Sequence, residues 1–395
     1  MPVVSTPTFY PKRLEEAAKA RGFTWKALAD AATIKPTTLS DYKRGHHTPS
    51  PDQLAKLARA LEFPEEYFLH PPKIGSQLIG PRLFRASSSL TQRAADQAET
   101  RLAWMAEVLV YAEEHLHTPK PEFLDAYAHI QEPLALDAQQ IEAIAISVRE
   151  RLGFGLSPII NLVRTLERAG IAILRYVSLA KIRIDGLSQH SELGRPLCAI
   201  FASEESSLAR ENFSLAHELG HLVLHGRIST QRFDELAEAK ILEDQANRFA
   251  SAFLLPAVPF LADVAAPAIS YFEHLKRKWR VSIAAMIRRC YDLGRITLAE
   301  YSSLNVRLSQ KRWRKREPLD DALEIEKPVL LSQVFTTLVK RHGIADEPIA
   351  RALALRERDL ASISGLPISF FSKPEPEANV LDFPNAFRDA SFGIS

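Results

Sequence analysis

The chain has 395 residues, of which 46% are hydrophobic, and a formal net charge of +2 at pH 7. This length exceeds what one hydrophobic core usually fills, so we expect two or three domains. Only Cys198 and Cys290 are present, which excludes a disulfide framework. No run of ~18 apolar residues and no secretion signal is found, so a cytoplasmic protein without a membrane span is expected.

The first part of the chain, Pro11 to Leu69, predicts four or five short helices. Pro11 can open the first helix, Gly22 can end it, and Pro36 stands at the start of the third helix. Thr24 can cap the second helix. Two helices joined by a short turn between Thr24 and Arg44 have the geometry of a helix-turn-helix, whose second helix enters the major groove of DNA.

This segment resembles the Xre/Cro-repressor type of DNA-binding domain, down to the Lys43-Arg44-Gly45 stop after the third helix. The resemblance implies that the third helix contacts DNA through bases or phosphates, and the matching positions are Lys35, Pro36, Thr37, Ser40, Asp41, Lys43 and Arg44. Residues 1–70 carry 10 Lys or Arg against 8 Asp or Glu, so attraction to DNA is modest. Protein binding or dimerisation is the alternative role.

The middle of the chain alternates breaks and helical patterns. Residues 71–80 have the composition of a linker, and residues 82–116 predict a long amphipathic helix that joins the two modules and can dimerise. Further helices are predicted at 141–152 and 158–169, and strands at Ile171–Val177 and Pro196–Ala202. Cys198 lies on the second strand, where a small apolar role is favoured over a nucleophile.

The segment Phe213–His221 places two imidazoles four residues apart in an apolar, helix-compatible run. On a helix, His217 and His221 share one face and can bind the same tetrahedral Zn²⁺. Glu218, next to the first histidine, can act on the water at such a zinc ion. An ordinary surface helix with a charge pair is the alternative, but the apolar surroundings disfavour it because burying unpaired charge is costly.

A catalytic zinc usually takes three protein ligands, so a third side chain is required. Residues 243–256 predict a second helix with an apolar stripe, and Glu243 or its neighbour Asp244 can supply the ligand. His225 continues the series from His221. The following residue is Gly226, so a role in capping the helix or supporting a ligand is favoured over metal binding.

Phe213–Gly226 and Glu243–Pro256 resemble the two signature helices of the ImmA/IrrE zinc metallopeptidases. The resemblance implies one Zn²⁺ per chain held by His217, His221 and Glu243, with Glu218 as general base. It also implies supporting roles for Asn247 and Phe249. Arg210 stands where this family commonly has an arginine, and it either orients the helix or anchors substrate.

In zinc peptidases of this type, a sheet edge beside the metal pairs with the extended substrate. Pro196–Ala202 is therefore the candidate substrate-binding strand. The histidine and glutamate residues leave the oxyanion-stabilising residue unassigned.

The charge of the C-terminal third is polarised. Residues 274–318 hold 13 Lys or Arg against 3 Asp or Glu, whereas residues 320–395 hold 8 against 12. The basic stretch can bind nucleic acid or an acidic protein, or it is a solvated helical face followed by a polar linker at 309–318.

The tail also repeats features of the first module. Leu360-Ala361, Leu366-Pro367 and Phe370-Phe371 follow the spacing of Leu57-Ala58, Phe63-Pro64 and Tyr67-Phe68, and Gly343 with Ile349-Ala350 follows Gly22 with Leu28-Ala29 at another offset. We therefore expect 329–371 to be a degenerate helix-turn-helix-like unit used for protein contact.

The expected fold is mainly α with a small β-sheet (α+β). It comprises an all-α helix-turn-helix domain at 1–70, a helical linker at 71–137, and a zincin-like metallopeptidase domain at 138–318. A helical domain at 319–373 and a loosely structured tail at 374–395 follow.

These features favour a DNA-binding zinc metalloendopeptidase that cleaves a regulatory, repressor-like protein. Such an enzyme would control transcription, a stress response, a mobile element or a toxin-antitoxin pair, and a homodimer is expected because Xre-like domains usually bind palindromic sites. The alternative is a transcriptional regulator whose metal domain is a sensor or scaffold without hydrolysis.

Overall fold

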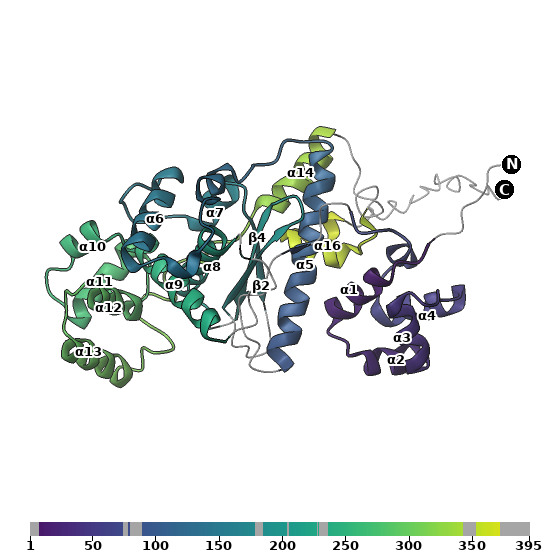
Figure 1. The fold of residues 1–395 in the computed structure, drawn as a ribbon, viewed down its shortest axis with the longest axis horizontal. Helices are drawn as coiled ribbons and strands as arrows, with labels where there is room; N and C mark the ends of the chain where they lie inside the picture. Colours follow the sequence, from purple (N-terminus) through teal and green to yellow (C-terminus); the bar gives the residue numbers. More distant parts are fainter. Residues whose placement is uncertain are drawn as a thin grey trace, which may run out of the picture.

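The structure is a computed structural model, and it describes residues 8–73, 78–79, 89–177, 185–203, 205–226, 228, 236–342 and 353–371. A small helical bundle lies at one end, helices α10 to α13 lie at the other end, and a sheet with long helix α5 lies between them (Figure 1). The expected fold class, mainly α with a small sheet, is confirmed.

The N-terminal bundle has the helix boundaries that the sequence predicts. It consists of α1 (Pro11–Arg21), α2 (Trp25–Ala32), α3 (Pro36–Arg44), α4 (Pro51–Leu61) and the 3-10 turn η1 (Glu65–Phe68). Gly22 ends α1 in the left-handed conformation at φ 69°, which glycine adopts without strain. Thr24 caps α2 by accepting a hydrogen bond from the amide of Ala27 at 3.2 Å.

A four-stranded sheet occupies the centre of the molecule. Its strands are β1 (Leu78–Ile79), β2 (Ala172–Val177), β3 (Gly186–Ser191) and β4 (Pro196–Ala202), in the order β1-β3-β4-β2. β2 runs parallel to β4, while β3 is antiparallel to both β4 and β1. The strands at β2 and β4 were expected from the sequence; β1 and β3 were not, because a two-residue strand and the polar segment Gly186–Ser191 carry no apolar strand pattern.

The position of β4 corrects one prediction. Pro196–Ala202 was expected to be the substrate-binding edge, but it pairs with β3 on one side and with β2 on the other. All seven of its residues are buried. A strand whose backbone is bonded on both sides cannot add a substrate strand, so this role is wrong for β4.

Successive side chains of a strand point to opposite faces of the sheet, and each face of this sheet packs against a different hydrophobic core. Leu174, Leu197 and Ala199 face α5 (Ser89–Glu113) and belong to the first core. Ile173, Cys198 and Ile200 face the opposite side and belong to the second core. The first core also includes the N-terminal bundle and the C-terminal helices, so α5 buries its apolar face within the chain. The predicted domain boundaries remain predictions.

Most of the remaining helices surround the second core. They are α6 (Ala138–Arg151), α7 (Leu162–Arg168), α8 (Leu208–Gly220), the π-helical turn η4 (His221–His225), α9 (Leu236–Leu254), α10 (Ala257–Asp263), α11 (Ile269–Trp279), α12 (Ile283–Asp292) and α13 (Leu298–Gln310), together with the 3-10 turns η2 (Glu122–Tyr127) and η3 (Pro133–Ala135).

The basic stretch at 274–318 is in part an internal structural element. Lys276 is fully buried, and its Nζ donates to Glu317 at 2.8 Å and to Asp320 at 2.5 Å. Glu317 also accepts from the amides of Ile283 and Ala284 at the start of α12. The segment expected to be a polar linker is therefore tied to α11 and α12 at its end.

The C-terminal unit repeats part of the N-terminal bundle. α16 (Glu357–Ser364) ends at left-handed Gly365, and Pro367 (φ −66°, ψ 151°) leads into η6 (Ile368–Phe370). In the first module α4 ends at left-handed Glu62, and Pro64 (φ −67°, ψ 150°) leads into η1. The expected repeat is supported there, whereas Gly343, Ile349, Ala350 and residues 374–395 lie outside the described residues.

The helix that precedes this unit, α14 (Leu330–His342), packs against α5, and α16 joins it there. Ala354, just before α16, has φ 50°, and Thr33, just before α3, has φ 55°. The described part of the C-terminal unit therefore repeats the 3-10 ending of the N-terminal bundle, and the helix-turn-helix-like corner stays a prediction.

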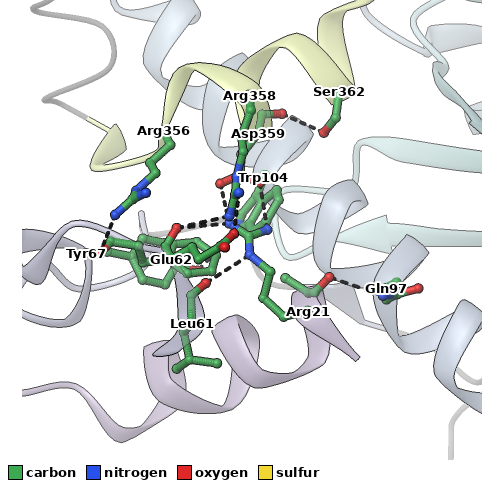
Figure 2. A network of polar contacts seen from close by, with 12 residues as sticks. Arg21, Leu61, Glu62, Tyr67, Gln97, Trp104, Arg356, Arg358, Asp359 and Ser362 are labelled. Carbon is green, nitrogen blue, oxygen red and sulfur yellow. Dashed lines mark hydrogen bonds and ion pairs between the residues drawn. The ribbon is translucent and has the colours of Figure 1, made fainter. Parts of the chain in front are cut away.

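An ionic network joins α16 to the N-terminal bundle (Figure 2). The guanidinium of Arg21 donates to both carboxylate oxygens of Asp359, at 2.8 and 2.7 Å, and to the carbonyls of Leu61 and Glu62. Arg358 pairs with the Glu62 carboxylate. These cations lie at the C-terminal end of α4, where the helix dipole favours positive charge.

A second ion pair fixes the other side of the bundle. Arg13 on α1 donates to both oxygens of Glu107 on α5, at 2.7 and 2.9 Å, and both side chains are 2% exposed. Its other donors bond to the carbonyls of His70 and Pro71 and to the Glu16 carboxylate. The bundle is therefore held to the rest of the chain by hydrogen-bonded charges as well as by apolar packing.

The Arg21–Asp359 contact predicts a measurable loss of stability. Arg21→Ala leaves the Asp359 carboxylate, 5% exposed, without its cation, and should lower the free energy of unfolding of the full chain by about 3 kcal/mol in a urea titration. Lys56→Ala breaks the exposed Lys56–Asp52 pair on α4 and should cost less than about 1 kcal/mol. Equal, small losses in both variants would contradict this prediction.

Candidate metal centre

Two crossing helices, α8 and α9, build the site. Ser207 caps α8 by accepting from the amide of Arg210, and Leu215 and Leu219 anchor it in the second core. Gly220 lies where the two helices meet: a Cβ there would stand 3.3 Å from Ala246 Cα and 3.1 Å from the Phe249 ring. The absence of a side chain at Gly220 lets α9 approach closely.

This close approach brings together the three side chains that the sequence singles out as ligands. The Nε2 atoms of His217 and His221 are 3.0 Å apart, and the Glu243 carboxylate lies 3.3 Å from the first and 3.4 Å from the second. Their ligand atoms all lie within 4.8 Å of one another. Two imidazole nitrogens and one carboxylate oxygen are the donors of a catalytic zinc site that keeps a position for water.

The neighbouring candidates are placed differently. Asp244, the alternative third ligand, is exposed and does not belong to this group. His225 is buried and contacts His221 Nδ1 at 2.8 Å through its own Nδ1, on the side of the His221 ring away from Glu243. Asn247 Oδ1 lies 3.1 Å from His217 Nδ1. Each histidine of the group thus has a hydrogen-bonding partner at Nδ1 and turns Nε2 toward Glu243.

The electrostatics of the group favour an ionised carboxylate. Burial opposes ionisation of Glu243, but hydrogen bonds and charge from His217 and His221 outweigh it and lower the pKa of Glu243 to about 2. Burial lowers the pKa of His225 to about 3, and His221 adds to this effect. Glu243 therefore carries its charge at neutral pH while His225 is neutral.

Glu218 is held against the sheet. Its side chain is buried, and its Oε2 accepts a hydrogen bond from the Ser188 hydroxyl of β3 at 2.7 Å. Burial raises the pKa of the Glu218 carboxyl. A Cβ at Gly186 would lie 2.6 Å from Glu218 Oε1, so the glycine leaves the space that the carboxylate occupies.

Sequence reasoning did not find Gly186, Ser188 or Gln245, a residue of α9 that contacts His225 at 3.0 Å. The first two lie on β3, the strand that carries no apolar pattern, so nothing in the sequence connects them to Glu218. Gln245 carries a weak signal, since it is a polar residue beside the apolar stripe of its helix.

Arg210 lies seven residues before His217, which is close to two helical turns and places both on one face of α8. It is exposed, and within the described parts of the chain its guanidinium makes no hydrogen bond or ion pair. No contact of the guanidinium thus supports a role in orienting the helix.

The candidate DNA-contacting face is α3. Leu39 and Tyr42 turn inward, whereas the side chains of Lys35, Pro36, Thr37, Lys43 and Arg44 are exposed and those of Ser40 and Asp41 are half-buried. Lys43 Nζ lies 4.6 Å from the centre of the Trp25 ring. The outward face of α3 is therefore exposed at both ends of the helix and half-buried at Ser40 and Asp41.

Comparison with known families agrees with this division. Residues 166–291 match the peptidase M78 family model, described as IrrE N-terminal-like domain, and residues 14–68 match a helix-turn-helix model. The chain joins a helix-turn-helix region to an IrrE-like region. The predicted fusion is thereby confirmed. The IrrE-like region contains His217, Glu218, His221 and Glu243, and it ends within α12.

No curated protein matches the chain. Within the described residues, no helix is long and apolar enough to cross a membrane. The matches to the peptidase M78 and helix-turn-helix models support a protein that links a DNA-binding region to a metallopeptidase region.

The geometry of the IrrE-like region predicts different effects for two adjacent acids. Glu243→Gln removes the anionic ligand and should weaken zinc binding by about 10²-fold or more, measured by competition with a chromophoric chelator. Asp244→Asn likewise replaces a carboxylate with an amide, but at an exposed residue outside the ligand group, and should leave one zinc per chain with unchanged affinity. Loss of zinc binding in Asp244→Asn alone would show that the ligand is misassigned.

Proposed function

We propose that this protein is a DNA-binding zinc metalloendopeptidase that cleaves a peptide bond in a regulatory, repressor-like protein. The observation that carries the proposal is the placement of Glu218: a buried carboxylate lies directly beside a group of two imidazoles and one carboxylate. A zinc that served only as a scaffold would need no such carboxylate. The match of residues 166–291 to a peptidase family supports the same reading.

His217, His221 and Glu243 would hold the zinc ion, one per chain. When bound, zinc supplies a Lewis acid that lowers the pKa of water and polarises a carbonyl group. Glu218 would take a proton from the attacking water and pass it to the departing amine, and the hydrogen bond from Ser188 to its Oε2 would hold the carboxylate in place.

The edge of β3 that faces away from β4 is the proposed substrate-binding strand, and its residues 186–189 are buried. Residues 186–189 pair with β4 on one side, while β1 pairs with β3 only at His190 and Ser191. Among the described residues, the other edge of 186–189 therefore has backbone groups left to pair with an extended peptide. Ser188 ties this strand to Glu218, so a peptide on this edge would lie beside the general base. Arg210, on the same helix face as His217, would anchor an acidic group of the substrate.

The helix-turn-helix region gives the peptidase a regulatory setting. DNA binding through α3 would place the enzyme at a promoter, and a substrate of the repressor type would connect cleavage to transcription, a stress response, a mobile element or a toxin-antitoxin pair. A homodimer that reads a palindromic site is part of this proposal.

Glu218→Gln separates hydrolysis from metal binding. The variant should keep wild-type zinc content, because Glu218 is outside the ligand group, and should lose cleavage of the repressor-like proteins encoded beside the gene by about 10²–10⁴-fold. Cleavage would be followed by mass spectrometry, with a chelated wild type as the control. Equal zinc loading with no cleavage by either protein, but tight binding to the gene's own promoter, would favour a regulator with a metal-sensing domain.

Charge removal on α3 tests the DNA-binding part. Lys35→Ala with Arg44→Ala removes two exposed cations from the ends of α3 and should reduce the slope of log affinity against log salt by up to about 1.8, or about 0.9 for each phosphate that is no longer neutralised. The measurement uses promoter DNA and fluorescence anisotropy at several salt concentrations. Lys278→Ala changes a residue of α11, a helix at the opposite end of the molecule from α3 (Figure 1), and should leave the slope unchanged; an equal change there would point to a different DNA surface.

A further inference from the structure

A buried chain of hydrogen-bonding side chains extends from the metal centre into the second core. His221 Nδ1 lies 2.8 Å from His225 Nδ1, and His225 Nε2 lies 3.0 Å from Gln245 Oε1. Gln245 Nε2 in turn donates to the carbonyls of Pro133 at 2.7 Å and Leu136 at 3.3 Å. His221, His225 and Gln245 are 2 to 5% exposed, so water does not replace these contacts.

The two carbonyls fix the orientation of the Gln245 amide. A backbone carbonyl can only accept, so the amide nitrogen of Gln245 must face Pro133 and Leu136. Its oxygen then faces His225 and can only accept, which requires a hydrogen on His225 Nε2. No carboxylate contacts the buried His225 ring among the described residues, so the neutral ring is favoured and its Nδ1 carries a lone pair.

That lone pair determines the state of the metal-binding histidine. His225 Nδ1 accepts from His221 Nδ1, so the hydrogen of the neutral His221 ring is on Nδ1 and its Nε2 lone pair faces His217 and Glu243. A histidine that binds a metal through Nε2 requires this tautomer. Donation therefore runs from His221 through His225 and Gln245 to the carbonyls of Pro133 and Leu136, and these two acceptors fix its direction.

We propose that His225 and Gln245 are positioning residues, which hold His221 with its hydrogen on Nδ1 and its Nε2 lone pair turned to the zinc. The inference rests only on the metal-binding part of the proposed function. His217 has a simpler arrangement, since Asn247 Oδ1 contacts its Nδ1 directly. The two ligand histidines thus use different partners, one near the surface and one in the core.

The backbone that carries the His221 and His225 rings differs from the rest of α8. Residues 221–225 form a π-helical turn with i to i+5 hydrogen bonding, wider than the α-helix that precedes it. The ring centres of His221 and His225 are 5.0 Å apart. Gly226 follows directly, and a Cβ there would lie 2.5 Å from the Leu222 carbonyl, so only glycine fits the end of this turn.

Zinc affinity of the full chain tests the proposal without any peptidase assay. His225→Leu and Gln245→Leu each break the chain of hydrogen bonds and should weaken zinc binding roughly 10- to 100-fold in a chelator competition. Val223→Ala, in the same buried turn, removes packing without removing a hydrogen bond, and should leave zinc affinity within about threefold. Thermal unfolding of each apo-protein verifies that the variants are folded.

Nitrogen-15 spectra of the histidine rings give a second readout. In zinc-loaded wild type, His221 should carry hydrogen on Nδ1 and bind zinc through Nε2, and His225 should be neutral with hydrogen on Nε2. Folded His225→Leu and Gln245→Leu variants with wild-type zinc affinity, or a His225 ring with hydrogen on Nδ1, would overturn the proposal. Zinc-loaded wild type that cleaves none of the repressor-like proteins would instead count against the proposed function and would leave this inference standing.

Discussion

The close crossing of α8 and α9 is the constraint on which the metal centre depends. His217 and His221 come from one helix and Glu243 from the other, so the three ligand atoms converge only if the helices touch. Gly220 allows this contact because a larger residue would press against Ala246 and Phe249. The same approach brings Gln245 to His225 and Asn247 to His217, so one packing contact places the candidate ligands and the side chains that contact them.

The sheet links this centre to the rest of the molecule. One face packs against α8, which carries the histidines, and the other packs against α5, on which the helix-turn-helix region rests. Arg13 pairs with Glu107 on α5, and Arg21 pairs with Asp359 on α16. These buried ion pairs fix the orientation of the bundle, because charged hydrogen bonds are directional and apolar packing is not. The N-terminal bundle and the candidate metal centre therefore lie on opposite faces of the same sheet, with α5 between the sheet and the bundle (Figure 1).

The basic stretch at 274–318 contains buried ion pairs, although its composition suggests a charged surface. Lys276 bonds to Glu317 and Asp320, and Arg289 donates to both oxygens of Glu142 at 2.5 and 2.7 Å. Both cations belong to the basic stretch, yet they hold α11, α12 and α6 together. A count of charges along the sequence cannot separate such internal cations from exposed ones, because the partner acids lie 41, 44 and 147 residues away.

The sequence by itself determined the helices of the N-terminal bundle, the spacing of His217 and His221 on one helix, and the pairing of a helix-turn-helix region with an IrrE-like region. The first two follow from local rules, since proline, glycine and capping residues set helix ends and the i, i+4 spacing sets a helix face; the third came from resemblance to two families. The tertiary structure decided that β4 is central, that β3 contacts Glu218 through Gly186 and Ser188, and that Gln245 reaches His225. The Ser188–Glu218 and His225–Gln245 contacts join residues 30 and 20 positions apart, and their geometry is fixed by which elements pack together, information that no local pattern contains.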